Sequence, residues 1–176
     1  MSRNSFGFSF GLTLILLAGP GLAAEVTIPI NAIDSTGVGA VIGTLRAKDS
    51  KAGMVVTPKL AGLGAGPHGF HVHENPACGT KEVDGKPVAG LAAGGHFDPD
   101  KSGHHEGPWG HGHQGDMPAL AVNGDGSATD PVVVPRLKVA DLKGRAVVIH
   151  ADADNYADQP KPLGGGGARV ACGVVP

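Results

Sequence analysis

Alternating and β-branched apolar runs recur along the chain, and they predict strands rather than helices. These runs cover residues 26–30, 39–46, 53–57, 68–74, 119–122, 129–134, 145–150 and 169–175. Short strands at near-regular spacing, with glycine-containing joints between them, are typical of a sandwich or barrel. We therefore predict an all-β domain of about eight strands in which no helical segment exceeds two turns.

Two long polar segments interrupt this pattern. Residues 75–118 are rich in Gly, Pro and His, and residues 152–167 end in four consecutive glycines. A loop of such length inside a compact domain is uncommon unless it is functional or disordered. Bound metal would order the first segment, so its length favours a site there. Within the later strand region, Asn123–Gly126 predicts a hairpin turn.

Composition changes this picture little. The chain has 30 glycines and 14 prolines among 176 residues, which touches the range where disorder becomes plausible. The glycines punctuate apolar runs, however, and 41% hydrophobic residues suffice for a core. A formal charge of −2 argues against nucleic acid as a partner.

The N-terminus has the pattern of a secretory signal peptide. Arg3 precedes the apolar run 6–18, and Leu22-Ala23-Ala24 forms a small-residue cleavage site. We predict cleavage after Ala23, which removes residues 1–23 and leaves one domain at residues 24–176 with a formal charge of −3. The run is too short to span a bilayer, so we expect no stable membrane anchor.

Export would also allow the two cysteines, Cys78 and Cys172, to pair in an oxidising compartment. A bridge between them would close a loop of roughly 95 residues and contribute about 4–5 kcal/mol on the chain-entropy model. Two buried free thiols are the alternative.

Histidines form the main candidate chemistry, since eight of the nine lie between His68 and His113. His71 and His73 are spaced i, i+2, so a strand would place both rings on one face, as half of a four-ligand copper site. An exposed histidine pair is the alternative. The loop adds His96, His104, His105, His111, His113 and Asp116. Three histidines and a carboxylate suit tetrahedral zinc, although a flexible metal-buffering segment has the same composition.

Three later residues admit both a functional and an ordinary interpretation. His150 ends an apolar strand, where histidine is more often packed than ligating. Asp154 could orient a metal-bound histidine by accepting its second ring N–H, or be a solvated loop residue. Arg169 lies three residues before Cys172 and could attract a small anion beside a metal, or be an ordinary surface arginine.

Taken together, these segments resemble copper–zinc superoxide dismutases from about Glu25 to the C-terminus. The motifs that carry the resemblance are Gly69–His73, Ala93–Pro99, Gly164–Arg169 and Ala171–Val174. Asp158–Leu163 and the short spacing from His73 to Cys78 resemble the bacterial periplasmic branch. The resemblance implies an eight-stranded Greek-key β-barrel or sandwich with two long functional loops, exported to the periplasm.

The resemblance also implies site residues, by position. It assigns copper to His71, His73, His96 and His150, and zinc to His96, His105, His113 and Asp116, with one ion of each per subunit. His96 would bridge the two metals and Arg169 would line the anion channel. Asp154 would join His71 to His105, Cys78 would pair with Cys172, and His68 would be structural. Between the adjacent His104 and His105 we choose His105, because the family ligand precedes one residue and then Gly-Pro; His111 receives no role.

The implied activity is dismutation of superoxide to dioxygen and hydrogen peroxide, by a monomer or a homodimer. One alternative is a periplasmic copper- or zinc-binding protein without redox turnover, which has no need for Arg169, for Asp154 or for a shared histidine. A zinc-only hydrolase is a weaker alternative, because it needs an open zinc position.

Overall fold

Seven strands form one curled antiparallel sheet in the computed structural model, which describes residues 23–176. Its order is β5-β10-β11-β1-β2-β3-β9. The strands are β1 (Glu25–Asp34), β2 (Gly37–Ser50), β3 (Gly53–Leu60), β5 (Phe70–His73), β9 (Val132–Val134), β10 (Ala146–His150) and β11 (Arg169–Val174). The predicted signal peptide, apart from Ala23, lies outside the described residues.

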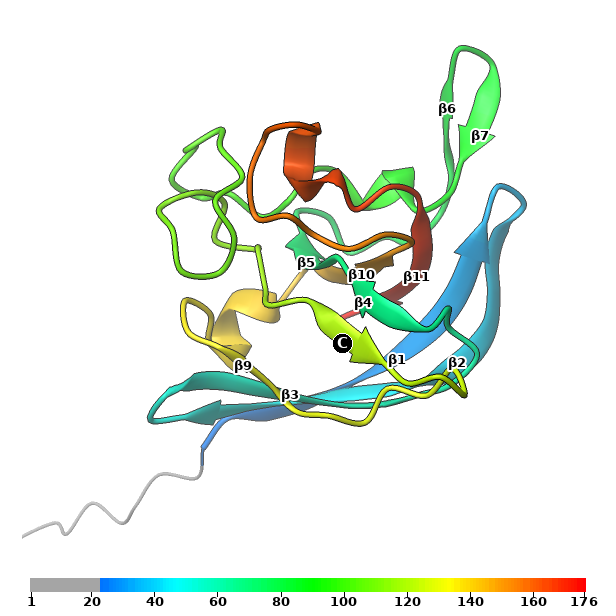
Figure 1. Ribbon diagram of the computed structural model, residues 1–176. Helices are drawn as coiled ribbons and strands as arrows, with labels where there is room; N and C mark the ends of the chain where they lie inside the picture. Colours follow the sequence, from blue (N-terminus) through cyan, green and yellow to red (C-terminus); the bar gives the residue numbers. More distant parts are fainter. Residues whose placement is uncertain (1–22) are drawn as a thin grey trace, which may run out of the picture.

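A second sheet continues this one through a single glycine. β4 (Gly66–His68) pairs with β8 (Leu120–Val122), and only Gly69 separates β4 from β5. One stretch of chain therefore changes its partner from β8 to β10 and curls the sheet toward a barrel (Figure 1). With β4 and β5 counted as one interrupted strand, the barrel has the eight strands predicted, and the all-β class is confirmed.

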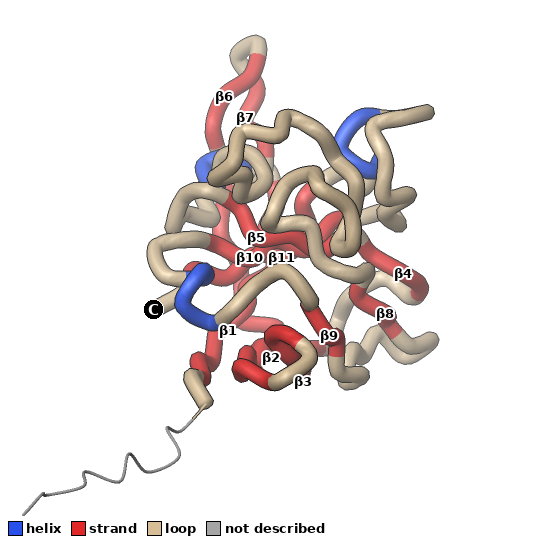
Figure 2. Tube along the Cα trace, turned by 90° about the vertical axis from the view of Figure 1, so that its left-hand side faces the viewer, coloured by secondary structure: helices blue, strands red, loops and turns tan. Residues whose placement is uncertain are grey.

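Two local features differ from the sequence predictions. The long loop contains a hairpin, β6 (Lys81–Val83) with β7 (Lys86–Val88), which projects from the body of the protein (Figures 1 and 2). Asn123–Gly126 does form a tight turn, closed by Asn123 N–H to Ser127 O at 2.8 Å. It is not a β-hairpin, because β8 pairs with β4 and β9 pairs with β3.

The sheet β5-β10-β11 is buried on both faces, and strand parity separates what each face touches. Phe70, Val72, Val147 and Ile149 pack into the main core inside the barrel. The intervening residues point to the outer face, where Ala146 and Val148 pack with Cys78 and Cys172. Strand parity also divides β1: Ile28 and Ile30 face the main core, whereas Ile33 belongs to the outer cluster. His71, His73 and His150 share the outer parity.

Both long connections lie at one end of the barrel and cover this outer face (Figure 2). They run from β5 to β8 and from β10 to β11, and carry short 3-10 helices at Leu91–Ala93 and Pro162–Gly165; a third, Val139–Leu142, precedes β10. The disulfide between Cys78 and Cys172 ties the first connection to β11 with a Cα–Cα separation of 5.7 Å. Within residues 23–176, no helix has the length and apolar character needed to cross a membrane.

Candidate metal centre

Two adjacent strands place the first three histidines of the centre. In the ladder between β5 and β10, His71 lies opposite Val148 and His73 lies opposite Ala146. Since His150 is two residues beyond Val148, it shares the outer face with both histidines. All three are at most 7% exposed, so the alternative of a surface histidine pair does not apply.

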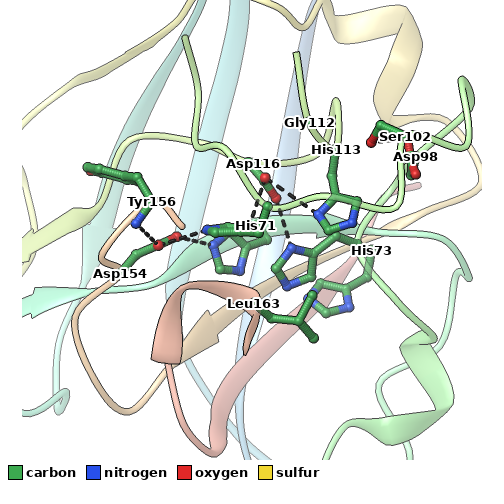
Figure 3. A network of polar contacts seen from close by, with 12 residues as sticks. His71, His73, Asp98, Ser102, Gly112, His113, Asp116, Asp154, Tyr156 and Leu163 are labelled. Atoms are coloured by element: carbon green, nitrogen blue, oxygen red, sulfur yellow. Dashed lines mark hydrogen bonds and ion pairs between the residues drawn. The ribbon is translucent and has the colours of Figure 1, made fainter. Parts of the chain in front are cut away.

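The long loop docks on β5 and brings His96 and Asp116 to the same face. Phe97 N–H donates to Val72 O at 2.8 Å, and Val72 N–H donates to Gly115 O at 2.9 Å. Isolated bridges then pair His96 with His73 and Asp116 with His71. Gly115 permits this approach, because a Cβ there would lie 2.3 Å from Val72 O. The result is a network of imidazoles and two carboxylates (Figure 3).

Hydrogen bonds fix the tautomers of the strand histidines. His71 donates from Nε2 to Asp154 Oδ2 at 2.7 Å, and His73 donates from Nδ1 to Gly94 O at 3.0 Å. His150 donates from Nδ1 to Gly167 O at 3.3 Å. A neutral imidazole that donates from one nitrogen keeps a lone pair on the other. Those other nitrogens, Nδ1 of His71 and Nε2 of His73 and His150, are buried without a hydrogen-bond partner.

These free nitrogens converge with His96. One potential ligand atom from each of His71, His73, His96 and His150 lies within 4.8 Å of all the others. Three lone pairs with fixed tautomers and a fourth imidazole are the donor set that copper prefers. The residues present therefore fit a copper ion.

A second group forms around Asp116. Its Oδ1 lies 2.8 Å from His96 Nδ1, and its Oδ2 lies 2.9 Å from His105 Nδ1 and 3.5 Å from His113 Nδ1. The Nδ1 atoms of His105 and His113 and Oδ2 of Asp116 lack hydrogen-bond partners. Three imidazoles and one carboxylate fit tetrahedral zinc.

By proximity alone the cluster around Asp116 contains His71, His96 and His105, whereas the more distant His113 is not part of it. The hydrogen bonds argue against a double role for His71. Its Nε2 donates to Asp154, so only Nδ1 is free, and one lone pair binds one metal. His96 differs, because each of its two nitrogens can face a different group. It is the histidine that the two groups share.

Asp154 connects the two groups by hydrogen bonds to one histidine of each, His71 and His105. Its Oδ1 accepts a hydrogen bond from His105 Nε2 at 2.8 Å, while Oδ2 accepts the one from His71. Gly164 closes over this pair with a φ of +74°, and a Cβ there would lie 2.0 Å from Asp154 Oδ1. Only glycine fits at this position, since both the dihedral angle and the space exclude a side chain.

Burial and hydrogen bonding set the charge of these groups in the metal-free protein. Burial lowers the pKa of His150 to about 3 and that of His96 to about 4, with further lowering by neighbouring histidines. The pKa of His73 falls well below its usual value for the same reason. These rings are therefore neutral at pH 7, the form that binds metal.

The pKa values of Asp116 and His105 shift in the directions that favour their charged forms. Burial would raise the pKa of Asp116, but the close approach of the His105, His113 and His96 rings outweighs it and holds that pKa far below its usual range. His105 lies between two carboxylates, and its pKa rises to about 9, because its contacts with the carboxylates of Asp116 and Asp154 outweigh its burial. The two carboxylates that flank the His105 ring therefore favour a positive charge at this position.

Arg169 stands beside the strand histidines on β11. Its guanidinium donates to Gly90 O and Gly94 O, each at 2.7 Å. Both carbonyls belong to the segment that the disulfide attaches to β11. Arg169 and Lys161 line a cleft of about 390 Å³ that reaches His96 and His150. Asp152 lines it too, so two cationic side chains face one carboxylate in the cleft that leads to the first group. A larger cleft of about 530 Å³ lies elsewhere, between the β2–β3 turn and residues 135–138, and no histidine lines it.

The remaining histidines separate by burial. His105 is 1% exposed, whereas His104 and His111 are exposed. His68 is buried and contacts the carbonyl oxygens of His150 and Gly64. Sequence reasoning missed the glycine carbonyls that hold Arg169 and His73, and it missed Tyr156, whose N–H donates to Asp154 Oδ1 at 2.7 Å. Backbone carbonyls carry no sequence signal, although the glycine-rich motifs marked their positions.

Known proteins share both the sequence and this architecture. The family model for copper/zinc superoxide dismutase (SODC) matches residues 40–175. A superoxide dismutase [Cu-Zn] of Salmonella typhimurium is 50% identical over 165 residues, covering 93% of this chain and 95% of the relative. The solved Cu/Zn superoxide dismutase from Brucella abortus superposes with a TM-score of 0.85 at 47% identity, covering 87% of this chain and all of that one. The monomeric copper, zinc superoxide dismutase from Salmonella enterica gives 0.79 at 51% identity, with the same coverage.

Proposed function

The chain belongs to the copper/zinc superoxide dismutase family and is a superoxide dismutase that uses copper and zinc, and on that premise we propose which of its residues carry the reaction. His71, His73, His96 and His150 bind copper. His96, His105, His113 and Asp116 bind zinc. The observations that carry this assignment lie on the two sides of the His96 ring: free, buried nitrogens of His71, His73 and His150 cluster with it on one side, and its Nδ1 contacts Asp116 on the other.

The reaction consumes two superoxide anions and two protons and yields dioxygen and hydrogen peroxide. Copper held by the first group would supply one-electron redox chemistry between two oxidation states, and the second group, which includes His96, would hold zinc. His96 keeps Nδ1 on the side of Asp116. Its Nε2 has one lone pair, so it would hold a proton for transfer to the reduced substrate only when it does not hold copper. Arg169 draws the anion into the cleft and orients it, since its guanidinium is fixed by two carbonyls.

Asp154 orients two of the proposed ligands. It accepts from His71 and His105 together, which fixes both ring orientations and raises the basicity of the nitrogens that face the metals. The disulfide holds Gly90 and Gly94 near β11 and so keeps Arg169 in place. His71, His105 and Arg169 are therefore each held by a group outside the ligand set.

We further propose that residues 1–23 are a signal peptide, that residues 24–176 form the mature domain, and that this domain works in the periplasm against extracytoplasmic superoxide. The sequence pattern of the N-terminus and the bacterial relatives support this. Of monomer and homodimer we favour the monomer, since the Salmonella enterica relative is described as monomeric. Cell fractionation and light scattering of the mature protein test these points.

The assignment of His96 is tested by dismutation assays and metal analysis of the loaded protein and its His96→Ala variant. We expect one copper and one zinc per subunit, high activity, and loss of most activity together with weaker binding of both metals in the variant. Full activity of His96→Ala, with both metals retained, would contradict the shared-histidine assignment.

A further inference from the structure

His113 is the least supported of the zinc-site histidines. Among the described residues, its ring makes no contact with a fixing partner other than Asp116, at 3.5 Å. His105, by contrast, is held from behind by Asp154 at 2.8 Å. A ligand without such a hydrogen bond depends on its backbone for orientation. The backbone of residues 104–116, here called the zinc loop, therefore decides where His113 points.

Arg136 forms hydrogen bonds directly to the backbone of the zinc loop. It follows β9 after Pro135, and its guanidinium donates to Gly112 O at 2.7 Å and to His113 O at 3.4 Å. In return, Gln114 donates from Nε2 to Arg136 O at 3.2 Å. The contacts thus cover the ligand and the residue on each side of it, and they connect the zinc loop to the turn that directly follows β9.

The segment around His113 is in turn hydrogen-bonded to the segment around His104 and His105; these two segments are here called the arms of the zinc loop. His113 N–H donates to His104 O at 2.9 Å, so the two arms pair backbone to backbone. A Cβ on Gly112 would lie 2.3 Å from His104 O, which shows how closely the arms approach. On the far side, Asp158 Oδ2 accepts from His105 N–H at 3.0 Å. Arg136 therefore holds one of the paired arms, at Gly112 and His113, and Asp158 holds the other, at His105.

We propose that Arg136 is a positioning residue of the zinc site: by fixing the carbonyls of Gly112 and His113 to the end of β9, it keeps the His113 ring aimed at Asp116. The proposal rests on the proposed assignment of His113 as a zinc ligand. Arginine suits the task because its planar fork can reach two carbonyls at once, whereas lysine offers a single ammonium point.

The test measures zinc affinity by chelator competition in Arg136→Met, Arg136→Lys and the matched control Arg46→Met. Arg46 pairs with Glu25 on the surface and is 57% exposed, so it removes an arginine far from the zinc loop. We expect about 10- to 100-fold weaker zinc binding in Arg136→Met, the range seen when partners of metal ligands are lost. Arg136→Lys should fall between this variant and the wild type, and Arg46→Met should match the wild type.

Two further readouts separate positioning from general support. Copper affinity of the zinc-loaded protein and unfolding of the metal-free protein should change much less than zinc affinity. The absorption of Co(II) bound in place of zinc should also change in Arg136→Met, because one ligand is displaced. Wild-type zinc affinity in Arg136→Met, or equal losses in zinc affinity, copper affinity and metal-free stability, would overturn the proposal. If Arg136→Met does not fold, wild-type zinc affinity in Arg136→Lys overturns it and a clear weakening supports it.

His113→Ala in the same assay distinguishes this inference from its premise. Loss of tight zinc binding in His113→Ala with an unaffected Arg136→Met would remove only the role of Arg136. Wild-type zinc affinity in His113→Ala would instead refute the ligand assignment, and the role of Arg136 with it.

Discussion

The Nδ1 atom of the His68 ring lies 2.7 Å from the backbone carbonyl oxygen of His150. On its other side, Nε2 lies 2.8 Å from Gly64 O. His68 thus joins the loop before β4 to the end of β10, at the residue that we assign to copper. Its place three residues before His71 puts it on the opposite side of the strand, in agreement with the structural role that the sequence implied.

Replacement of His68 should therefore disturb copper more than zinc. His68→Ala leaves the carbonyl of His150 buried without its donor, which costs about 1–3 kcal/mol of stability. We also expect roughly 10-fold weaker copper binding, because the backbone of a ligand is loosened. Denaturant titration and copper competition assays measure the two effects. Unchanged copper affinity would show that β10 holds His150 without help.

Removal of a ligand that belongs only to the copper group should abolish copper binding and leave zinc binding intact. His150 belongs to the copper group and has no contact with Asp116, so His150→Ala should lose tight copper binding and dismutation while zinc stays. Metal analysis after dialysis, together with an activity assay, checks this. Retention of full activity would reject His150 as a ligand.

Charge reversal at Arg169 tests the attraction of the anion. Arg169→Glu should slow turnover about 10-fold or more and weaken its dependence on ionic strength, because local positive potential accelerates the encounter. The distant, exposed Arg46→Glu is the control, and it should leave both quantities nearly unchanged. Kinetics measured over a range of salt concentrations decide; equal behaviour of the two variants would remove the steering role.

The neighbours His104 and His105 offer a comparison within one dipeptide. His105→Ala should lose zinc, since it removes the ring between Asp116 and Asp154. His104→Ala should keep one zinc per subunit, because that side chain is exposed. Zinc content after dialysis distinguishes them, and loss of zinc only in His104→Ala would reverse the assignment.

Acid should destabilise the metal-free protein well above the pKa of a carboxyl group. Burial lowers the pKa of His150 to about 3 and that of His96 to about 4, whereas in the unfolded chain both titrate near 6.5. Between these values the unfolded state binds more protons, so stability falls as pH drops from about 6.5 toward 4, by up to about 1.4 kcal/mol per pH unit for each ring. The raised pKa of His105 does not oppose this, because its contribution is complete below 6.5 and is lost only as pH rises toward 9.

Urea unfolding of chelator-treated protein at several pH values measures this slope. His150→Ala should show a shallower dependence than the wild type, since one of the buried neutral rings is gone. A flat profile between pH 6.5 and 4.5 would mean that water reaches these rings in the metal-free state.

By itself, the sequence determined the class of the fold and the identity of the candidate chemistry. Apolar runs with period two and glycine joints predicted the strands, since each strand buries one parity of residues against the core. The same parity predicted that His71 and His73 share a face. The glycine-rich C-terminal motif and the His-x-His strand were local patterns, so they could be recognised without coordinates.

Only the tertiary structure decided which ring nitrogen is free, which of His104 and His105 is buried, and what holds the site from behind. Those answers depend on contacts between segments distant along the chain, such as Asp154 with His71 or Arg136 with Gly112. Many of the partners are backbone carbonyls, which every residue type supplies equally and which therefore leave no trace in the sequence. A hydrogen bond to a carbonyl is specified by the path of the chain, and that path is known only once the chain has folded.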